Sequence, residues 1–527
     1  MVSLAEFRQG TPIPRPAGTH QVTERTAPGR FLRTVWRTHF YAAIFATPIL
    51  VLMAITGLII MYTEPVTGLL HPGATRVAAH GQPALGLATQ QATAAAAAPP
   101  GATLFRVVTP KEPDRVTEFF YSTGPAGVPY YKLADSQVTY VNVNPYAGTV
   151  TATGHPGDDL VSLANRMHTS LNNQSLTVPL PSLAHLIAPG DNPKAIQQIP
   201  VGDLIIEISM GWALILALSG LYLWWPRRSQ KGKTLLAPRI RAKGRLKWRD
   251  LHAASGILAL GMLLVFITTG MPWSAYWGNT LSAVNTTLTP GPSVDTPSTL
   301  AKAGDLDRFG KRIPWATQED RVPASSTTAV DAGRPAKFSL TDVARAAQQE
   351  GMQPGYDIVL PIDEKNAQGQ TIYGSYQLAN PWPGRINTDK TIYLDQFSGK
   401  KLLQSDSSSS GAIGQATSFG VYTHMGTEFG VIDRITMTTG ALLLLVSIGT
   451  SLVMWWIRRP QGRTGLPKRP ANPRLPRTLA LVGLAVALIY PLWGVSALVV
   501  IMLDWFVIRR VGRLRSAFGM PTPTIPA

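Results

Sequence analysis

Long apolar stretches alternate with long polar ones along this chain, and the alternation predicts helices that cross a membrane. A transmembrane α-helix needs about 20 consecutive residues that are mostly apolar. Stretches of about this length with few charges cover residues 39–62, 204–225, 251–273 and 432–457. The chain is therefore expected to be a polytopic α-helical membrane protein that lies in a lipid bilayer.

A fifth apolar stretch, residues 478–508, differs because Pro491 and Gly494 interrupt it. One straight helix would end on the opposite side of the membrane from its start. Basic residues flank both ends of the stretch, however, and such residues favour the cytoplasmic side of a membrane. We therefore expect a hairpin of two short helices here, with a single helix as the alternative.

The polar regions 63–203 and 274–431 each contain the pattern of a β-hairpin. Alternating apolar and polar residues lead into a turn that holds an aromatic residue and a glycine, after which the alternation resumes. The turn residues are Tyr146 and Gly148 in the first region, and Phe397 and Gly399 in the second. Small α+β domains are thus expected outside the membrane. Two further segments complete the pattern, a capped helix over 339–352 and an Ala-rich linker over 88–102.

The unit of helix, polar domain and helix occurs twice. Each first helix follows a Trp-Arg pair and a histidine, and it ends in a Thr-Gly step; His39 to Gly57 and His252 to Gly270 are both 18 residues. The second helices end in the matching motifs GLYLWWPRR and SLVMWWIRRP, and RMHTSL and YTHMGT precede them. A duplicated unit followed by an apolar hairpin is the predicted architecture.

Charge sets the expected orientation. The formal net charge is +18. The N-terminal tail, two loops and the C-terminal segment hold 27 basic against 3 acidic residues, whereas the two long polar regions hold 20 against 24. This asymmetry is typical of a membrane protein whose basic loops lie in the cytoplasm. We therefore do not expect a nucleic-acid partner. The expected cytoplasmic pieces are residues 1–38, 226–250, 458–477 and 509–527.

The absence of cysteine limits the possible redox centres. It excludes disulfides, thiolate-held iron–sulfur clusters and a covalently attached c-type haem. The chain also lacks a Walker loop and a G-x-G-x-x-G motif after a strand, so a nucleotide- or flavin-binding domain is unsupported. A redox centre would have to be held by histidine.

Four of the nine histidines recur at equal positions of the repeat: His39 with His252, and His168 with His424. An imidazole at the end of a membrane helix is costly unless it is ligated or hydrogen-bonded. Two equivalent pairs are the pattern of axial ligands to the iron of two b-type haems. Interfacial histidines that only form hydrogen bonds are the alternative.

Arginines lie within three residues of three candidate ligands and were considered as cofactor contacts. They are Arg37, Arg166 and Arg249. A guanidinium can bind a haem propionate through two parallel hydrogen bonds. Contact with phospholipid is the competing interpretation.

These residues together resemble the PepSY-associated transmembrane family, which includes bacterial inner-membrane ferrisiderophore reductases and iron-regulated membrane proteins. The matching motifs are R-T-H-F-Y with I-T-G-L, L-S-G-L-Y-L-W-W-P-R-R, L-H-x-x-x-G with T-T-G, and the hairpins Y-V-N-V-N-P-Y-A-G and I-Y-L-D-Q-F-S-G. The resemblance implies PepSY-like external domains, haem b in the membrane core, and electron transfer to a periplasmic ferric chelate.

The leading functional expectation is thus an inner-membrane di-haem protein that reduces a ferric siderophore. Its electrons would come from an unidentified donor, either a quinol or a cytoplasmic reductase. No general acid or base is needed, so no catalytic side chain is assigned. Two other classes stay open: a non-redox regulator or binding protein, and a component of iron-chelate transport.

The charge asymmetry makes a testable prediction about topology. Reporter fusions at Ile240 and Gly465 should behave as cytoplasmic, and fusions at Phe120 and Glu350 as external, because basic loops are retained on the cytoplasmic side. Paired phosphatase and fluorescent-protein fusions would measure this. An external signal from Ile240 would overturn the assignment.

Overall fold

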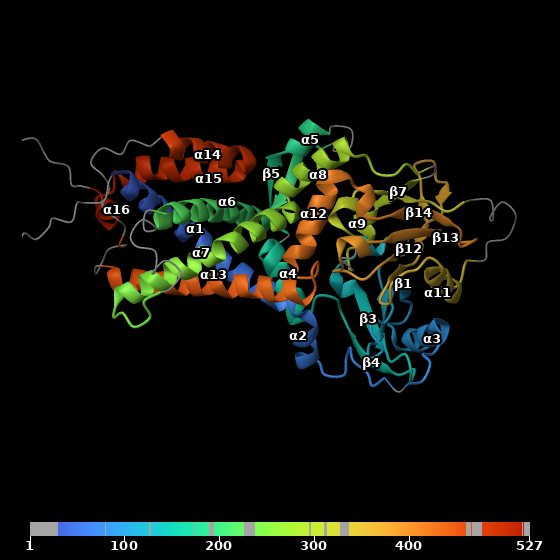
Figure 1. Ribbon diagram of the computed structural model, residues 1–527. Helices are drawn as coiled ribbons and strands as arrows, with labels where there is room; N and C mark the ends of the chain where they lie inside the picture. The colour runs from blue at the N-terminus through green and yellow to red at the C-terminus, as the bar shows by residue number, and fades with distance from the viewer. Residues whose placement is uncertain are drawn as a thin grey trace, which may run out of the picture.

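The computed structural model shows a helical bundle with a sheet domain at one of its ends (Figure 1). We call this end of the bundle the sheet end. The structure describes residues 30–79, 81–125, 128–173, 175–188, 194–225, 238–294, 297–309, 313–326, 337–459, 465, 477–518 and 520.

The bundle is built from helices that are long and apolar enough to cross a membrane. Five such helices occur among the described residues, and they place the protein in a membrane. The four longest are α1 (Arg30–Met61), α6 (Val201–Trp224), α7 (Arg245–Gly270) and α13 (Val431–Arg458). Helices α1 and α7 begin before the apolar stretches that predicted them, because their basic first turns are helical too.

The C-terminal apolar stretch forms a hairpin, as predicted. Helices α14 (Arg477–Ile489) and α15 (Pro491–Leu503) lie side by side (Figure 1), and Pro491 opens the second helix. The hairpin packs on α6, where Trp493 occupies the space that a side chain at Gly211 would fill. The indole Nε1 of Trp212 also donates to Ser496 Oγ at 3.1 Å.

The two polar regions join in a single antiparallel sheet of eight strands, in the order β14-β13-β12-β9-β1-β2-β3-β4. Each half supplies a helix and four strands, and the halves meet where β1 pairs with β9. Both predicted hairpins are present, β3–β4 and β13–β14. The first half has α3 (Leu87–Ala97), β1 (Thr103–Val108), β2 (Thr117–Ser122), β3 (Val138–Val143) and β4 (Val150–Gly154). The second half has α11 (Leu340–Gln349), β9 (Asp357–Val359), β12 (Ser375–Ala379), β13 (Thr391–Asp395) and β14 (Lys401–Ser405).

Shorter elements complete the fold. The helices among them are α2 (Thr63–Leu70), α4 (Leu160–Ser170), α5 (Leu183–Ile187), α8 (Trp277–Leu288), α9 (Ala303–Leu306), α12 (Gly411–His424) and α16 (Gly512–Ala517). The remaining strands form two-stranded ribbons, β5 (Thr177–Pro181) with β6 (Ile196–Pro200), β7 (Pro297–Lys302) with β8 (Arg321–Pro323), and β10 (Glu364–Lys365) with β11 (Thr371–Ile372).

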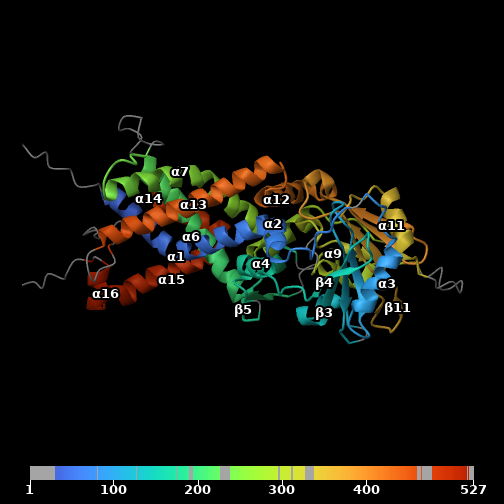
Figure 2. The same cartoon turned by 90° about the horizontal axis from the view of Figure 1, so that it is seen from below.

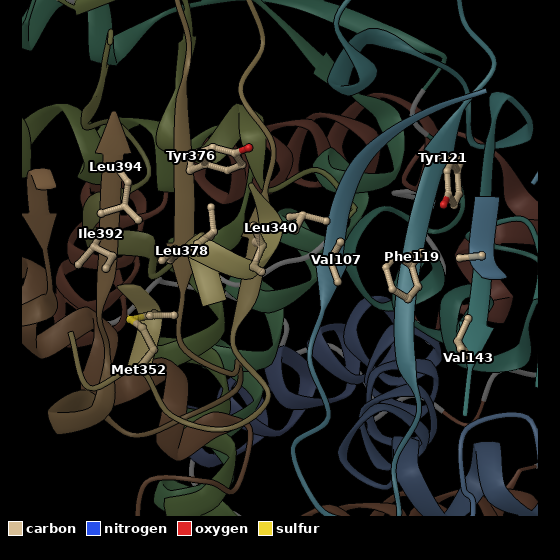
Figure 3. Close-up of a cluster of buried hydrophobic side chains, with 14 of the residues drawn as sticks. Val107, Phe119, Tyr121, Val143, Leu340, Met352, Tyr376, Leu378, Ile392 and Leu394 are labelled. Carbon is tan, nitrogen blue, oxygen red and sulfur yellow. The ribbon is translucent and has the colours of Figure 1, made fainter. Parts of the chain in front are cut away.

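Helices α3 and α11 cover the face of the sheet that is turned away from the bundle (Figures 1 and 2). Their contact with the strands forms an apolar core that includes Val107, Phe119, Leu340 and Leu378 (Figure 3). Residues 88–97 of the Ala-rich segment lie in α3, so the interpretation of the whole segment as a linker was wrong. Ala94 is fully buried, because small side chains let the helix pack closely on the sheet.

A buried ion pair holds the seam between the halves. The β1–β9 register pairs Val107 with Ile358, which makes Arg106 and Asp357 equivalent positions about the local two-fold axis. Arg106 Nε donates to Asp357 Oδ1 at 2.8 Å, and its side chain and that of Asp357 are only 3% and 4% exposed. Two identical halves would bring like charges together here. The pair therefore favours association of the unlike halves.

We predict that Arg106→Leu lowers the free energy of unfolding by about 3–5 kcal/mol, because it leaves the Asp357 carboxylate buried without its partner. Denaturant unfolding of the purified protein would measure this. The matched control is Arg76→Leu, which removes an exposed ion pair to Asp114 and should cost under about 1 kcal/mol. Equal effects of the two substitutions would contradict a special role for the seam pair.

Candidate functional site

The bundle brings the four repeated histidines together as two pairs. The rings of His39 in α1 and His252 in α7 face each other, with centres 6.4 Å apart and planes at 65°. The rings of His168 in α4 and His424 in α12 have centres 6.3 Å apart and planes at 76°. These are the two pairs that the repeat predicts.

The spacing within each pair suits a shared metal ion. A metal bound by both rings would hold their centres about 6 Å apart, because a metal–imidazole bond is about 2 Å long and a ring centre lies about 1 Å behind its nitrogen. Among the described residues, no group of three or more His, Cys, Asp or Glu side chains could hold a metal ion. Each pair therefore offers two protein ligands, and other ligands would have to come from elsewhere.

The two pairs lie near opposite ends of the bundle. We call His39 and His252 the inner pair, and His168 and His424 the outer pair. Thr56, which contacts His168, lies 17 residues after His39 on the same helix, α1. At about 1.5 Å of rise per residue, this separation is about 26 Å. The outer pair is the one at the sheet end.

Hydrogen bonds define the protonation of the outer pair. Thr56 Oγ1 lies 2.9 Å from His168 Nδ1 and 2.7 Å from the carbonyl of Leu52. A hydroxyl has one proton, and the nearer carbonyl can only accept it. This arrangement favours the tautomer in which Nδ1 of His168 carries a proton and donates to the threonine oxygen.

The second histidine of the outer pair repeats this arrangement. Thr269 Oγ1 donates to the carbonyl of Val265 at 2.5 Å and accepts from His424 Nδ1 at 2.9 Å. In the first of the two repeated units, Thr56 has the same role for His168. In both rings Nε2 is then the nitrogen with a free lone pair, which is the form that binds a metal.

The inner pair has the same protonation with different acceptors. His39 Nδ1 lies 3.0 Å from Ser219 Oγ, whose proton goes to the carbonyl of Ile215 at 2.6 Å. His252 Nδ1 lies 3.0 Å from the carbonyl oxygen of Ser447, which can only accept. All four imidazoles thus present Nε2 as the ligating nitrogen.

Glycines let three of these rings lie against a neighbouring helix. A Cβ at Gly57 would be 3.2 Å from His168 Cε1, one at Gly220 3.1 Å from His39 Cε1, and one at Gly270 3.3 Å from His424 Cε1. Each of these glycines directly follows the hydroxyl residue that holds the ring. Gly440 has a different role, because a Cβ there would meet Met262 and not a histidine.

Two short helices position the outer pair and are tied to the sheet domain. Helix α12 is anchored by the hydroxyl of Tyr422, which donates to the buried carboxylate of Asp389, as Ser407 does from η7 (Ser407–Ser409). Burial raises the pKa of Asp389 to about 6, although these two donors oppose the shift. Helix α4 is capped by Asp159, whose carboxylate accepts from Ser162 N at 2.8 Å.

Burial also affects the titration of the outer histidines. It lowers the pKa of His168 to about 4 and that of His424 to about 3, with the charge of His168 as a second cause for His424. A buried imidazole is harder to charge because it loses its hydration. Both rings are therefore neutral near pH 7, as a metal ligand must be.

The three candidate arginines each have a partner within the chain. Arg37 donates to Tyr41 Oη at 3.1 Å and to the carbonyl of Phe518 at 3.4 Å. Arg166 donates to the carbonyl of Gly157 at 2.8 Å and to Asn172 Oδ1 at 2.9 Å. Arg249 pairs with Asp250 at 2.9 Å. A role for them as propionate contacts stays a prediction.

The residues that hold the rings are not among the candidates that the sequence predicted. Thr56 and Thr269 belong to the repeated Thr-Gly step, which was used only to mark the ends of two helices. Ser219 precedes Gly220 in the matching motif of α6. A hydroxyl residue before a glycine in three helices was the available signal. Ser447 contacts His252 Nδ1 through both its carbonyl oxygen, at 3.0 Å, and its Oγ, at 3.1 Å, but it precedes Ile448 and so does not show this signal.

A duplicated unit of membrane helix, α+β domain and membrane helix, with a histidine pair near each end of the bundle, defines a class of polytopic membrane protein. The family described as the PepSY-associated TM region matches residues 36–458, and the chain belongs to this family. No curated protein matches the chain.

Proposed function

We propose that this protein is a di-haem b-type electron-transfer protein of a bacterial inner membrane, which reduces a ferric chelate outside the cytoplasm. The observation that carries the proposal is the hydrogen bonding of the four histidines together with their spacing. Each Nδ1 lies within hydrogen-bond distance of a hydroxyl or a carbonyl oxygen, which leaves Nε2 for a ligand, and the ring centres within each pair are separated by a distance that suits a shared metal ion. Two imidazoles and no further side-chain ligand suit an iron whose other ligands come from a macrocycle.

His39 with His252, and His168 with His424, would hold the two haems as axial ligands. When bound, haem supplies one-electron redox chemistry at each pair. The chain's own contribution is to hold the rings in one tautomer, to surround them with apolar helices that exclude water, and to separate the two sites by most of the membrane thickness. No proton has to leave the imidazoles when a ligand binds, because each neutral ring would keep its proton on Nδ1 and leave the lone pair of Nε2 free.

The charge distribution supports an orientation for this path. The basic pieces of the chain favour the cytoplasm, so the inner pair would face a cytoplasmic or membrane donor such as a reductase or a quinol. The outer pair and the sheet domain would then face the periplasm. A ferric siderophore is the proposed acceptor there, because its iron is released on reduction to the less highly charged ferrous ion.

The ligand assignment predicts which haem each substitution removes. His39→Ala and His252→Ala should each lose the same one of two haems, and His168→Ala and His424→Ala the other, because one axial ligand is lost from each site. Pyridine haemochrome assays and spectra of the purified variants would measure this. His155→Ala is the control, since its Nδ1 bonds to the carbonyl of Val138 and the residue belongs to neither pair. Unchanged haem content in all four variants would disprove the assignment.

The acceptor assignment predicts reoxidation by a ferric chelate. Dithionite-reduced protein mixed with a ferric hydroxamate siderophore should return to the oxidised spectrum, and a ferrous chelator should trap iron. His168→Ala should slow this reaction at least tenfold, because it removes a ligand nearest the acceptor. Protein that stays reduced with several ferric chelates would exclude siderophore reduction. That result would leave a transmembrane haem protein with another acceptor. Purified protein that contains no haem would instead favour a non-redox regulator.

A further inference from the structure

A hydroxyl residue followed by glycine forms a small shelf under three of the four imidazole rings. The shelves are Thr56–Gly57 in α1, Ser219–Gly220 in α6 and Thr269–Gly270 in α7. In each, the hydroxyl accepts from the Nδ1 edge of the ring while the glycine admits the Cε1 edge. Each ring is thus held at two points, which fixes both its distance from the helix and its rotation.

A third residue of α7, Phe266, also contacts the ring of His424. Phe266, Thr269 and Gly270 are spaced by three and four residues, so they share one face of α7. The ring of Phe266 lies 5.4 Å from that of His424, with the planes at 71°. An aromatic edge, a hydroxyl and a glycine therefore surround one imidazole on a single helix face. Such support from surrounding residues is what orients a metal ligand and tunes the metal that it binds.

We propose that Thr56, Ser219 and Thr269 are positioning residues, which set the angle between the paired imidazole planes and the reduction potential of each site. This inference rests on the proposed function. The hydroxyl oxygen accepts a hydrogen bond from Nδ1–H and so increases the electron density at Nε2. A more electron-rich ligand stabilises the ferric state of a bound iron. Loss of the acceptor should raise the reduction potential and free the ring to rotate away from the observed 76°.

The test substitutes Thr269 by valine, which keeps the volume and removes the hydroxyl. Thr268→Val is the matched control: this neighbouring hydroxyl is exposed and donates only to backbone carbonyls, at 2.9 Å to Leu264 and 3.2 Å to Val265. We expect Thr269→Val to retain two haems while one of two low-spin ferric signals shifts in the electron paramagnetic resonance spectrum. In a potentiometric titration, the same site should become easier to reduce. Thr268→Val should match the wild type in both measurements.

Two more variants separate positioning from folding. Thr269→Ser restores a hydroxyl and should return both readouts toward the wild type. Gly270→Ala keeps the hydroxyl but places a methyl group 3.3 Å from His424 Cε1, so it should shift the spectral signal of the same site. Loss of one haem in Thr269→Val but not in Thr269→Ser would also support the positioning role, because it would show that haem binding itself needs the hydroxyl. If Thr269→Val kept two haems with the wild-type spectrum and potential, the inference would be overturned while the di-haem proposal stood.

Discussion

The need to satisfy both nitrogens of an imidazole inside an apolar bundle is the constraint on which this structure depends. A buried polar group without a partner costs free energy that a membrane helix can recover only from its neighbours. Each Nδ1 finds a hydroxyl or a carbonyl on an adjacent helix, and each Nε2 is left for a ligand. The helix–helix contacts that carry the hydroxyls also bring the rings together, so packing and site geometry have a common origin.

The duplication of the unit explains why there are two histidine pairs. The ion pair at the β1–β9 seam explains why the two halves of the sheet pair with each other and not each with a copy of itself. Equivalent helices place a histidine from each unit in both pairs, which a single unit could not do. Two identical units would bring like charges together at the β1–β9 junction, whereas Arg106 and Asp357 attract each other there. The buried pair also costs desolvation, so its value lies in selecting the unlike partner rather than in stability alone.

The sequence predicted the features that repeat and not those that depend on tertiary contact. The spacing of the histidines, the two hairpins and the C-terminal helix pair all follow from local patterns. The Ala-rich segment was misjudged because its low complexity resembles a linker, and only the sheet beneath α3 gives its small residues a purpose. The partners of Arg37 and Arg166 could not be foreseen either, since Phe518 and Gly157 are brought to them by the fold.

The connection of the outer pair to the sheet differs in kind from that of the inner pair. The inner histidines lie on membrane-spanning helices, where the lipid and the bundle fix them. The outer histidines lie on α4 and α12, and each of these helices comes after an edge strand: α4 follows β4, and α12 follows β14 and η7. The sheet is thus continuous between the two segments that lead to His168 and His424, while hydroxyls on α1 and α7 hold the two rings from the bundle side.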